Sequence, residues 1–235
     1  MRLIDALRDA VRLLCSGDGT LWGIIWLSLK TSILGLALAT PPAVITGYLL
    51  ATSNFAGRRL CIWLAQAALS IPTVLIGLLL YLMLSRQGPA GGLHWLFSQP
   101  GVIAGQFFIA VPVLLAFTLS AVQAADPRLA ETAVTLGASR YRIMATVLHE
   151  TRFGVMAAII YGFGRVISEV GCAMMVGGNI AGATRTITTA IALETSKGEF
   201  AQGIALGAVL IAIALVINAG LMLVQGDLGN QRRAL

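Results

Sequence analysis

The sequence predicts an all-α membrane protein with five transmembrane helices. Of its 235 residues, 57% are hydrophobic and only 11% are charged, whereas an ordinary soluble domain carries roughly 25% charged residues. Because so few charges cannot cover a water-facing surface, the bilayer must solvate much of the chain. The apolar residues also form long windows without the alternation expected of barrel strands. The spanning elements are therefore helices.

The N-terminal segment, residues 1–20, predicts a short amphipathic helix and not a cleavable signal peptide. It mixes acidic and basic residues and lacks the apolar centre of a signal sequence. Its apolar side chains recur at helical spacing on one face, at Leu3, Ile4, Leu7, Val11 and Leu14. Such a helix lies either among the membrane lipids at the interface or against the flank of the protein itself.

Five apolar windows follow, and each exceeds the roughly 20 residues that cross the hydrocarbon core. They cover residues 21–57, 60–85, 101–123, 153–176 and 202–225. The first contains Pro41 and Pro42, which are expected to kink its helix because proline removes a donor and clashes with the preceding turn. The fourth contains Arg165 and Glu169.

The distribution of basic residues predicts the orientation of these spans. Five spans place the termini on opposite sides, so the segments 52–60, 125–152 and 226–235 share one side. These segments carry most of the arginines outside the spans, and the positive-inside rule makes that side cytoplasmic. We therefore expect an inner-membrane protein with its N-terminus outside and its C-terminus in the cytoplasm. No linker divides the chain, so residues 1–235 are expected to form a single transmembrane domain.

The cytoplasmic loop 125–152 differs from its apolar flanks. Asp126 followed by Pro127 is a typical helix start, and Gly137 permits a sharp bend. Ser139 can cap a second helix. The pattern predicts two short amphipathic helices that project into the cytoplasm. Their apolar face needs a cover, which is either a partner protein or the ends of the chain's own helices, and the residues alone favour neither.

This loop also carries a resemblance to a known family. Glu131-Thr132-Ala133, Gly137 and Val147, at these spacings, resemble the signature loop of type I ABC importer permeases. In that family the loop forms the coupling helix that docks on the ATPase subunit. The resemblance implies an ATPase-coupling site made of Glu131, Thr132, Ala133, Gly137, Ala138, Ser139, Arg140 and Tyr141. His149 and Glu150 depart from the family's Leu-Pro ending, which leaves the exit from the loop less well defined.

The resemblance extends over about residues 20–225 and indicates a branch of the family. Gly162-Phe163-Gly164-Arg165 with Glu169-Val170-Gly171 resembles the molybdate and tungstate permeases, and residues 188–198 most resemble the tungstate permeases. It implies the permease subunit of an ATP-driven importer for an oxyanion, with tungstate as the first candidate and molybdate as the second. It also implies a homodimer, cytoplasmic ATPase subunits, and a periplasmic or lipid-anchored oxyanion-binding protein.

Several other chemistries find no support in the sequence. The chain has no glycine-rich loop ending in Gly-Lys-Ser/Thr, so ATP is expected to be bound by the partner subunit, and neither a cofactor nor enzymatic activity is expected. Basic tracts and stacking aromatics are absent, which excludes nucleic-acid binding. Cys15, Cys61 and Cys172 are far apart, so no metal site is predicted.

Four polar residues are candidates for the translocation pathway or its gate. Arg165 and Glu169 are four apart and are expected on one helix face. Arg165 either lines the passage and attracts the oxyanion or forms an internal ion pair, and the nearby partner favours the pair. Asn179 and Arg185, with Thr184 and Thr186, either offer donors to an oxyanion near the outer mouth or form an ordinary turn in which Arg185 meets the binding protein.

Two functions from other classes compete with an importer. The first is a secondary transporter driven by an ion gradient, in which Glu169 is a proton or cation site. The second is a membrane scaffold that presents the loop 125–152 to a partner without transporting anything. ATP-dependent uptake distinguishes the importer from both alternatives.

Overall fold

The computed structural model describes residues 11–12 and 17–232, with residues 221–232 described by their backbone alone. No strand occurs in these residues, which confirms the predicted all-α fold. The helices are α2 (Gly19–Thr52), α3 (Arg58–Ala67), α4 (Thr73–Leu84), α5 (Gln99–Gln123), α6 (Arg128–Thr135), α7 (Arg140–Glu150), α8 (Arg152–Ile167), α9 (Gly171–Gly177), α10 (Ile187–Lys197) and α11 (Phe200–Arg232). Two 3-10 turns cover Ala68–Ser70 and Gly91–Leu93. Most of the amphipathic segment predicted over residues 1–20 lies outside the described residues.

The described residues contain three to five candidate membrane spans, and the predicted five are reached only when each of two bent helix pairs is one span. Three helices, α2, α5 and α11, are long and apolar enough to cross a membrane. Two bent pairs raise the number to five when each pair is one span. In the first pair α3 with its 3-10 turn meets α4 at 97°, and in the second α7 meets α8 at 70°.

The window 60–85 is not the continuous span that its lack of charge predicts. The helix ends at Ser70, Ile71 is extended, and α4 begins after Pro72. Proline forces the residue before it out of the helical region and has no N–H to continue the hydrogen-bond ladder. Pro41 and Pro42 behave differently, because α2 continues as a helix through both.

The window 153–176 is also interrupted, although it contains no proline. Helix α8 ends at Ile167, and α9 begins at Gly171. Glu169 therefore lies beyond the end of α8 and not on one continuous helix face with Arg165, as the spacing had suggested. The break is held by side chains: Glu169 Oε1 accepts the N–H of Cys172 at 3.0 Å, and Thr188 Oγ1 donates to the carbonyl of Glu169 at 2.7 Å.

Helix α5 is the centre of the bundle and packs against α2, α4, α8 and α9. Glycines make these contacts close. A Cβ added at Gly47 of α2 would lie 2.9 Å from the carbonyl oxygen of Leu115, and one at Gly35 would lie 2.7 Å from Cβ of Gln106. Small residues let helix backbones approach in this way within a membrane. Helix α5 thereby fixes the positions of α2 and α9, which carry or border the polar sites described below.

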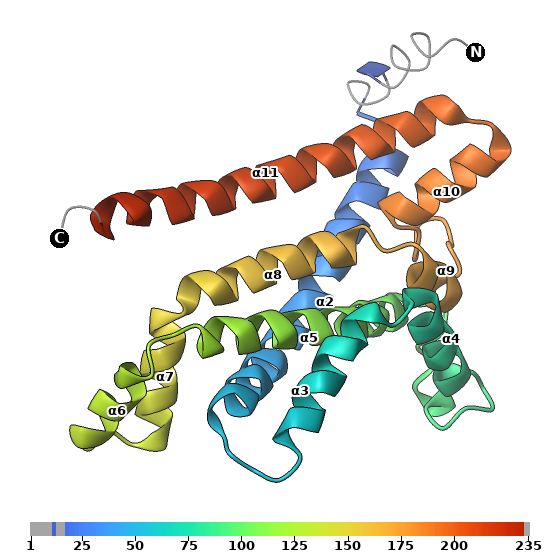
Figure 1. Ribbon diagram of the computed structural model, residues 1–235. Coiled ribbons are helices and arrows are strands. Elements are labelled where there is room, and N and C mark those ends of the chain that lie inside the picture. The colour runs from blue at the N-terminus through green and yellow to red at the C-terminus, as the bar shows by residue number, and fades with distance from the viewer. Residues whose placement is uncertain (1–10, 13–16, 233–235) are drawn as a thin grey trace.

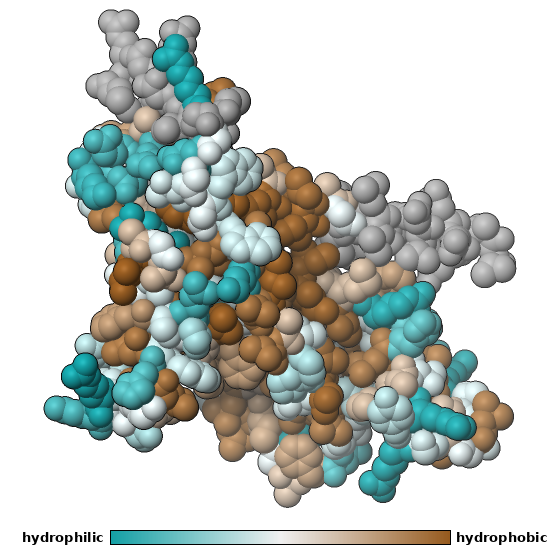
Figure 2. All heavy atoms as spheres, turned by 180° about the vertical axis from the view of Figure 1, so that it is seen from behind, coloured by the Kyte–Doolittle hydropathy of each residue, from teal (hydrophilic) through white to brown (hydrophobic). Residues whose placement is uncertain are grey.

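The hairpin of α6 and α7 and the α9–α10 region lie at opposite ends of the molecule (Figure 1). The turn from α10 into α11 is also at the α9–α10 end. Figure 2 shows hydrophobic side chains gathered over the middle of one face and hydrophilic ones towards its extremities. This distribution is the one expected of a protein whose middle is surrounded by lipid.

Candidate functional site

The loop 125–152 folds as the sequence predicts, into two short helices joined at a glycine. Asp126 Oδ1 accepts the N–H of Arg128 at 2.9 Å at the start of α6. Gly137 has a φ of +75°, which only glycine adopts without strain. Ser139 then caps α7 by accepting the N–H of Arg142 at 3.4 Å. Helix α7 ends at Glu150 and turns by 70° into α8, so the residues His149 and Glu150 close the loop without a proline.

The two ends of this hairpin have different surroundings. Val147 in α7 is buried against Tyr48 of α2 and Val122 of α5, which anchors the hairpin to the bundle. At the bend, Leu136 is 82% exposed and Tyr141 is 75% exposed. The chain therefore covers the base of the apolar face and leaves the tip bare. The eight predicted coupling residues lie on this hairpin, where six are exposed and Ala133 and Ala138 are half-buried.

Arg165 and Glu169 form an ion pair, with 2.9 Å between Nη1 and Oε2. The Glu169 side chain is only 4% exposed, and that of Arg165 is 37% exposed. Since the other carboxylate oxygen accepts the N–H of Cys172, both oxygens of Glu169 are engaged. This geometry fits the internal tie better than a site in the passage. A proton or cation site at Glu169 would first require the release of Arg165.

Asn179 and Arg185 contact each other in the connection between α9 and α10. Asn179 has a φ of +52°, which asparagine tolerates better than most residues, and its Nδ2 donates to the carbonyl of Thr189 at 3.3 Å. Arg185 Nε donates to Asn179 Oδ1 at 3.3 Å, and its Nη2 donates to the Asn179 carbonyl at 3.4 Å. Thr184 and Thr186 are buried and bond within the connection, so neither hydroxyl is free for an anion.

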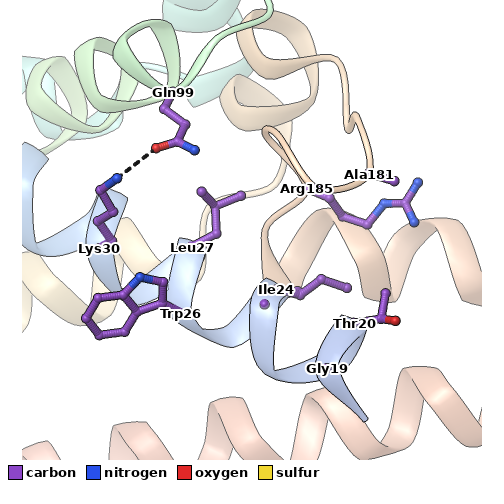
Figure 3. A pocket seen from close by; sticks show the side chains of 11 residues that line it. Gly19, Thr20, Ile24, Trp26, Leu27, Lys30, Gln99, Ala181 and Arg185 are labelled. Carbon is purple, nitrogen blue, oxygen red and sulfur yellow. Dashed lines mark hydrogen bonds between the residues drawn. The ribbon is translucent and has the colours of Figure 1, made fainter.

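A cavity of about 270 Å³ lies between the first turns of α2 and this connection (Figure 3). Arg185 lines it from the α9–α10 connection, and Lys30 lines it from α2. Lys30 Nζ donates to Oε1 of Gln99, the first residue of α5, at 3.1 Å. Arg165, Glu169 and Asn179 are not among the lining residues.

Lys30 is a functional candidate that the sequence reasoning missed. The signal was present, because Lys30 is the one charged residue between Leu21 and Phe55. Polar and charged residues inside a membrane span are costly and mark functional sites by default. Among the described residues, no group of three or more histidines, cysteines, aspartates or glutamates is placed to hold a metal ion.

A helical bundle that crosses the membrane several times, with a two-helix hairpin at one end and a cation-lined cavity near the other, has the build of a membrane transport subunit. The chain belongs to the family of binding-protein-dependent transport system inner membrane components, whose model matches residues 43–229. It is accordingly a multi-pass component of the inner membrane.

Curated relatives and a solved structure agree with this family. The chain is 37% identical to the tungstate uptake system permease protein TupB of Campylobacter jejuni over 92% of its own length and 90% of the relative. It is 32% identical to the molybdenum transport system permease protein ModB of Haemophilus influenzae, over 70% of this chain and 76% of that one. The fold matches a chain from the crystal structure of an amino acid ABC transporter with histidines, with a TM-score of 0.68 and 16% identity over 91% and 96% of the two chains.

Proposed function

We propose that this chain is the translocation subunit of an ATP-driven importer of a tetrahedral oxyanion, with tungstate as the substrate. The observation that carries the proposal is the similarity to the tungstate permease of Campylobacter jejuni, which runs along almost the whole of both chains. Molybdate is the second candidate, since the molybdenum permease is also a relative, although less identical and over a shorter stretch.

The ATPase that drives transport is a separate subunit, and its docking site is the tip of the α6–α7 hairpin. Exposed Leu136 and Tyr141 supply an apolar patch there, and Arg140 and Arg142 add positive charge beside it. Exposed apolar side chains at the tip of a polar hairpin are typical of a surface that a partner protein covers. The buried base at Val147 transmits a push on the tip to α2 and α5, because it packs against both.

The importer works as a homodimer, with the passage between two copies of this chain. One protomer has a small interior in which α5 is surrounded by its own helices, which leaves little room for a pathway. The N-terminus faces outside and the C-terminus faces the cytoplasm. An external oxyanion-binding protein then delivers the anion to the end of the molecule that holds Lys30 and Arg185, opposite the α6–α7 hairpin.

Uptake by cells tests the substrate. In the protein's own organism, deletion of the gene for this chain should reduce uptake of submicromolar tungstate, measured as cell tungsten by mass spectrometry, and a plasmid copy should restore it. Excess molybdate and excess sulfate, added separately, rank the competing anions. Unchanged tungsten uptake in the deletion strain would refute the proposal, and a stronger loss of molybdenum uptake would reassign the substrate.

ATP dependence is tested in proteoliposomes that contain the permease, its ATPase and its binding protein. Tungstate should accumulate with ATP and not with a non-hydrolysable analogue. Uptake that follows an imposed ion gradient in the absence of ATP would instead support a secondary transporter. No uptake under either condition, with deletion having no effect in cells, would favour a scaffold.

A further inference from the structure

We propose that one face of α8 forms part of the wall of the passage through which the oxyanion crosses the membrane. This face consists of Tyr161, Gly164 and Ser168, which we call the α8 stripe. Residues three and four apart lie on the same side of a helix, and the N–H of Ser168 still bonds to the Gly164 carbonyl, so the three form one line. The inference rests on the proposed function, because it assigns the passage of that importer to particular residues.

The α8 stripe is open to the surroundings of the protomer. Helix α8 packs against α2, α5 and α11, and it lies between α5 and α11 in Figure 1. The stripe is on the remaining side, where Tyr161 is 57% exposed and Gly164 and Ser168 are exposed as well. A Cβ added at Gly164 would meet no atom within 4 Å. The described part of the chain therefore leaves this face uncovered.

The stripe lies at the depth of the hydrocarbon core. Helix α8 begins at Arg152, directly after the α6–α7 hairpin. At 1.5 Å per residue, Tyr161 is about 14 Å and Ser168 about 24 Å along the helix from that start. Since the hydrocarbon core is about 30 Å thick, both residues are surrounded either by lipid or by something that replaces lipid.

The composition of the stripe differs from that of other exposed faces in the spans. The exposed side chains of α4 are all apolar, namely Val74, Leu75, Leu78, Leu79, Leu82 and Met83. The large exposed side chains of α11 are Ile211, Leu215 and Val216. Lipid can surround those faces. The stripe instead presents a phenol, a helix turn without a side chain and a hydroxyl, and polar groups at this depth usually face protein or water.

The charge beside the stripe is the stronger reason to exclude lipid. A lone serine can face lipid, because the Ser168 hydroxyl donates to the Gly164 carbonyl at 2.8 Å. The neighbouring Arg165 side chain is 37% exposed, whereas that of its partner Glu169 is 4% exposed, so the exposed part of this ion pair is positive. A partly exposed guanidinium at this depth is costly against lipid and favourable beside water or an anion.

The same ion pair limits how tightly an anion is held. Arg165 keeps its role as an internal tie, because its Nη1 donates to Glu169 at 2.9 Å. A cation that is already paired attracts a passing oxyanion less strongly than a free one. Passage requires binding that favours entry but is weak enough to allow release. The positive edge of the stripe meets both conditions.

Gly164 has no packing role that explains a glycine. It lies within α8 and does not have a positive φ, and its Cβ position is open. Gly162 differs, since a Cβ there would lie 3.1 Å from Cδ1 of Leu36. Glycine is a poorer helix former than alanine or leucine, so it is unfavourable at position 164 for α8 itself. What it provides is free space in front of the helix, which suits an ion that must move past.

Thiol accessibility tests the inference in the permease–ATPase complex, purified in lipid nanodiscs so that both sides of the membrane are open to solvent. Single cysteines are introduced after Cys15, Cys61 and Cys172 have been replaced by alanine. An anionic methanethiosulfonate reacts with thiols in water and not in lipid. Tyr161→Cys and Ser168→Cys should react at least tenfold faster than the matched controls Leu78→Cys and Ile211→Cys, which lie on exposed apolar faces.

The rates are measured with and without a non-hydrolysable ATP analogue, so that two states of the importer are sampled. Stripe cysteines that react no faster than the controls in either state would overturn the inference. If they are unreactive but form a disulfide between two copies on oxidation, the stripe is a dry contact between copies and the inference is likewise wrong.

A size series at Gly164 tests the role of the free space. Gly164→Ala and Gly164→Leu introduce better helix formers into open space, so neither should lower the thermal midpoint. In proteoliposomes with the ATPase and binding protein, Gly164→Leu should reduce tungstate uptake at least tenfold, and Gly164→Ala should retain most of it. Gly207→Leu is the matched control, because Gly207 of α11 is equally open. Full uptake by Gly164→Leu, or an equal loss in Gly207→Leu, would contradict the inference.

The outcomes separate this inference from the proposed function. If cells need the chain for tungstate uptake but the stripe cysteines react like the controls, the importer stands and another face lines the passage. If the stripe cysteines react rapidly but deletion leaves tungstate and molybdate uptake intact, the proposed substrate fails and the stripe still faces water.

Discussion

The ion pair between Arg165 and Glu169 is asymmetric, because only the carboxylate is buried. Replacing Arg165 with Gln leaves a carboxylate in an apolar environment with no cation to compensate it, which is the costly way to break a pair. Replacing Glu169 with Gln leaves a partly exposed guanidinium that can reach water. We therefore predict that Arg165→Gln lowers the thermal midpoint of the purified protein more than Glu169→Gln. The expected loss is on the order of 1–2 kcal/mol, reduced by the exposure of Arg165.

The double variant is the control for this prediction. Arg165→Gln with Glu169→Gln removes both charges, so it should be more stable than Arg165→Gln alone. Double-mutant cycles isolate such a coupling when the residues are in contact. Equal midpoints for the three variants would show that the pair does not hold the α8–α9 junction. Loss of transport with an unchanged thermal midpoint would instead support the alternative in which Arg165 lines the passage.

Cys172 of α9 is enclosed by glycines from two neighbouring helices, and these glycines are not equivalent. A Cβ added at Gly77 of α4 would lie 2.8 Å from Cα of Cys172, which is backbone. A Cβ at Gly105 of α5 would lie 2.7 Å from Sγ, the end of a side chain. We predict that Gly77→Ala and Gly105→Ala both lower the thermal midpoint. A Cys172→Ala background should rescue Gly105→Ala and leave Gly77→Ala unrescued. Rescue of both, or of neither, would contradict this packing.

Only part of the candidate site could be predicted from the local sequence around each residue. Asn179 and Arg185 are six apart in a glycine-rich connection, so local sequence alone brings them together. Lys30 is more than 150 residues from Arg185, and no local pattern pairs them. The fold creates that cavity, because the start of α10, directly after the α9–α10 connection, is bonded to α2 from the Ile187 N–H to Ser28 Oγ at 2.7 Å. The roles of all these residues remain predictions.

At the scale of helices, hydropathy found the spans but not the two breaks within them. An uncharged window shows which residues lipid can surround. It does not show whether the helix runs straight through the window or breaks within it. Pro72 offered a local signal for the first break, since proline restricts its predecessor. The second break at 168–170 has no such signal. It depends on Thr188, which reaches the Glu169 carbonyl from nineteen residues away.

The bend between α6 and α7 depends on Gly137, whose φ of +75° strains any side chain with a β-branch. Gly137→Val should cost about 1–3 kcal/mol locally and change the angle of the hairpin tip. In proteoliposomes with the ATPase and binding protein, we predict fewer tungstate ions imported per ATP hydrolysed. Gly57→Val is the matched control, because Gly57 has a φ of +91°, is equally open, and joins α2 to α3. A similar loss of coupling in both variants would count against a special role for the hairpin.

The exposed tip of the hairpin makes a separate prediction about assembly. Leu136 is 82% exposed, so Leu136→Ser should change the stability of the permease by less than about 0.5 kcal/mol. If the ATPase covers this side chain, its loss should weaken binding of the ATPase about tenfold or more, as for a central interface residue. Co-purification and titration of the ATPase measure this. Phe55→Ser removes an exposed apolar side chain from the α2–α3 connection and should leave ATPase binding unchanged.

For the whole molecule, α5 separates the two ends to which we assign functions in our proposal. Its 25 residues extend about 37 Å, which is enough to cross a hydrocarbon core of about 30 Å once. The connection before α5 and the hairpin after it must then lie on opposite sides of the membrane. The cation-lined cavity includes Gln99 at the first end of α5, and the proposed ATPase contact follows the last. Under the proposed function, one central helix would link substrate entry at one end to ATP-driven motion at the other.

Labelling from each side of the membrane tests this arrangement and its orientation. In a background with Cys15, Cys61 and Cys172 replaced by alanine, single cysteines are placed at two exposed positions, Arg86→Cys and Glu131→Cys. In intact cells with a permeabilised outer envelope, a membrane-impermeant maleimide should label residue 86 and not residue 131. Opening the inner membrane should make residue 131 reactive. The reverse pattern would invert the orientation while keeping the fold, because α5 would still cross once. Labelling of both residues from the same side would refute the single crossing itself, and the separation of the two functional ends would fail with it.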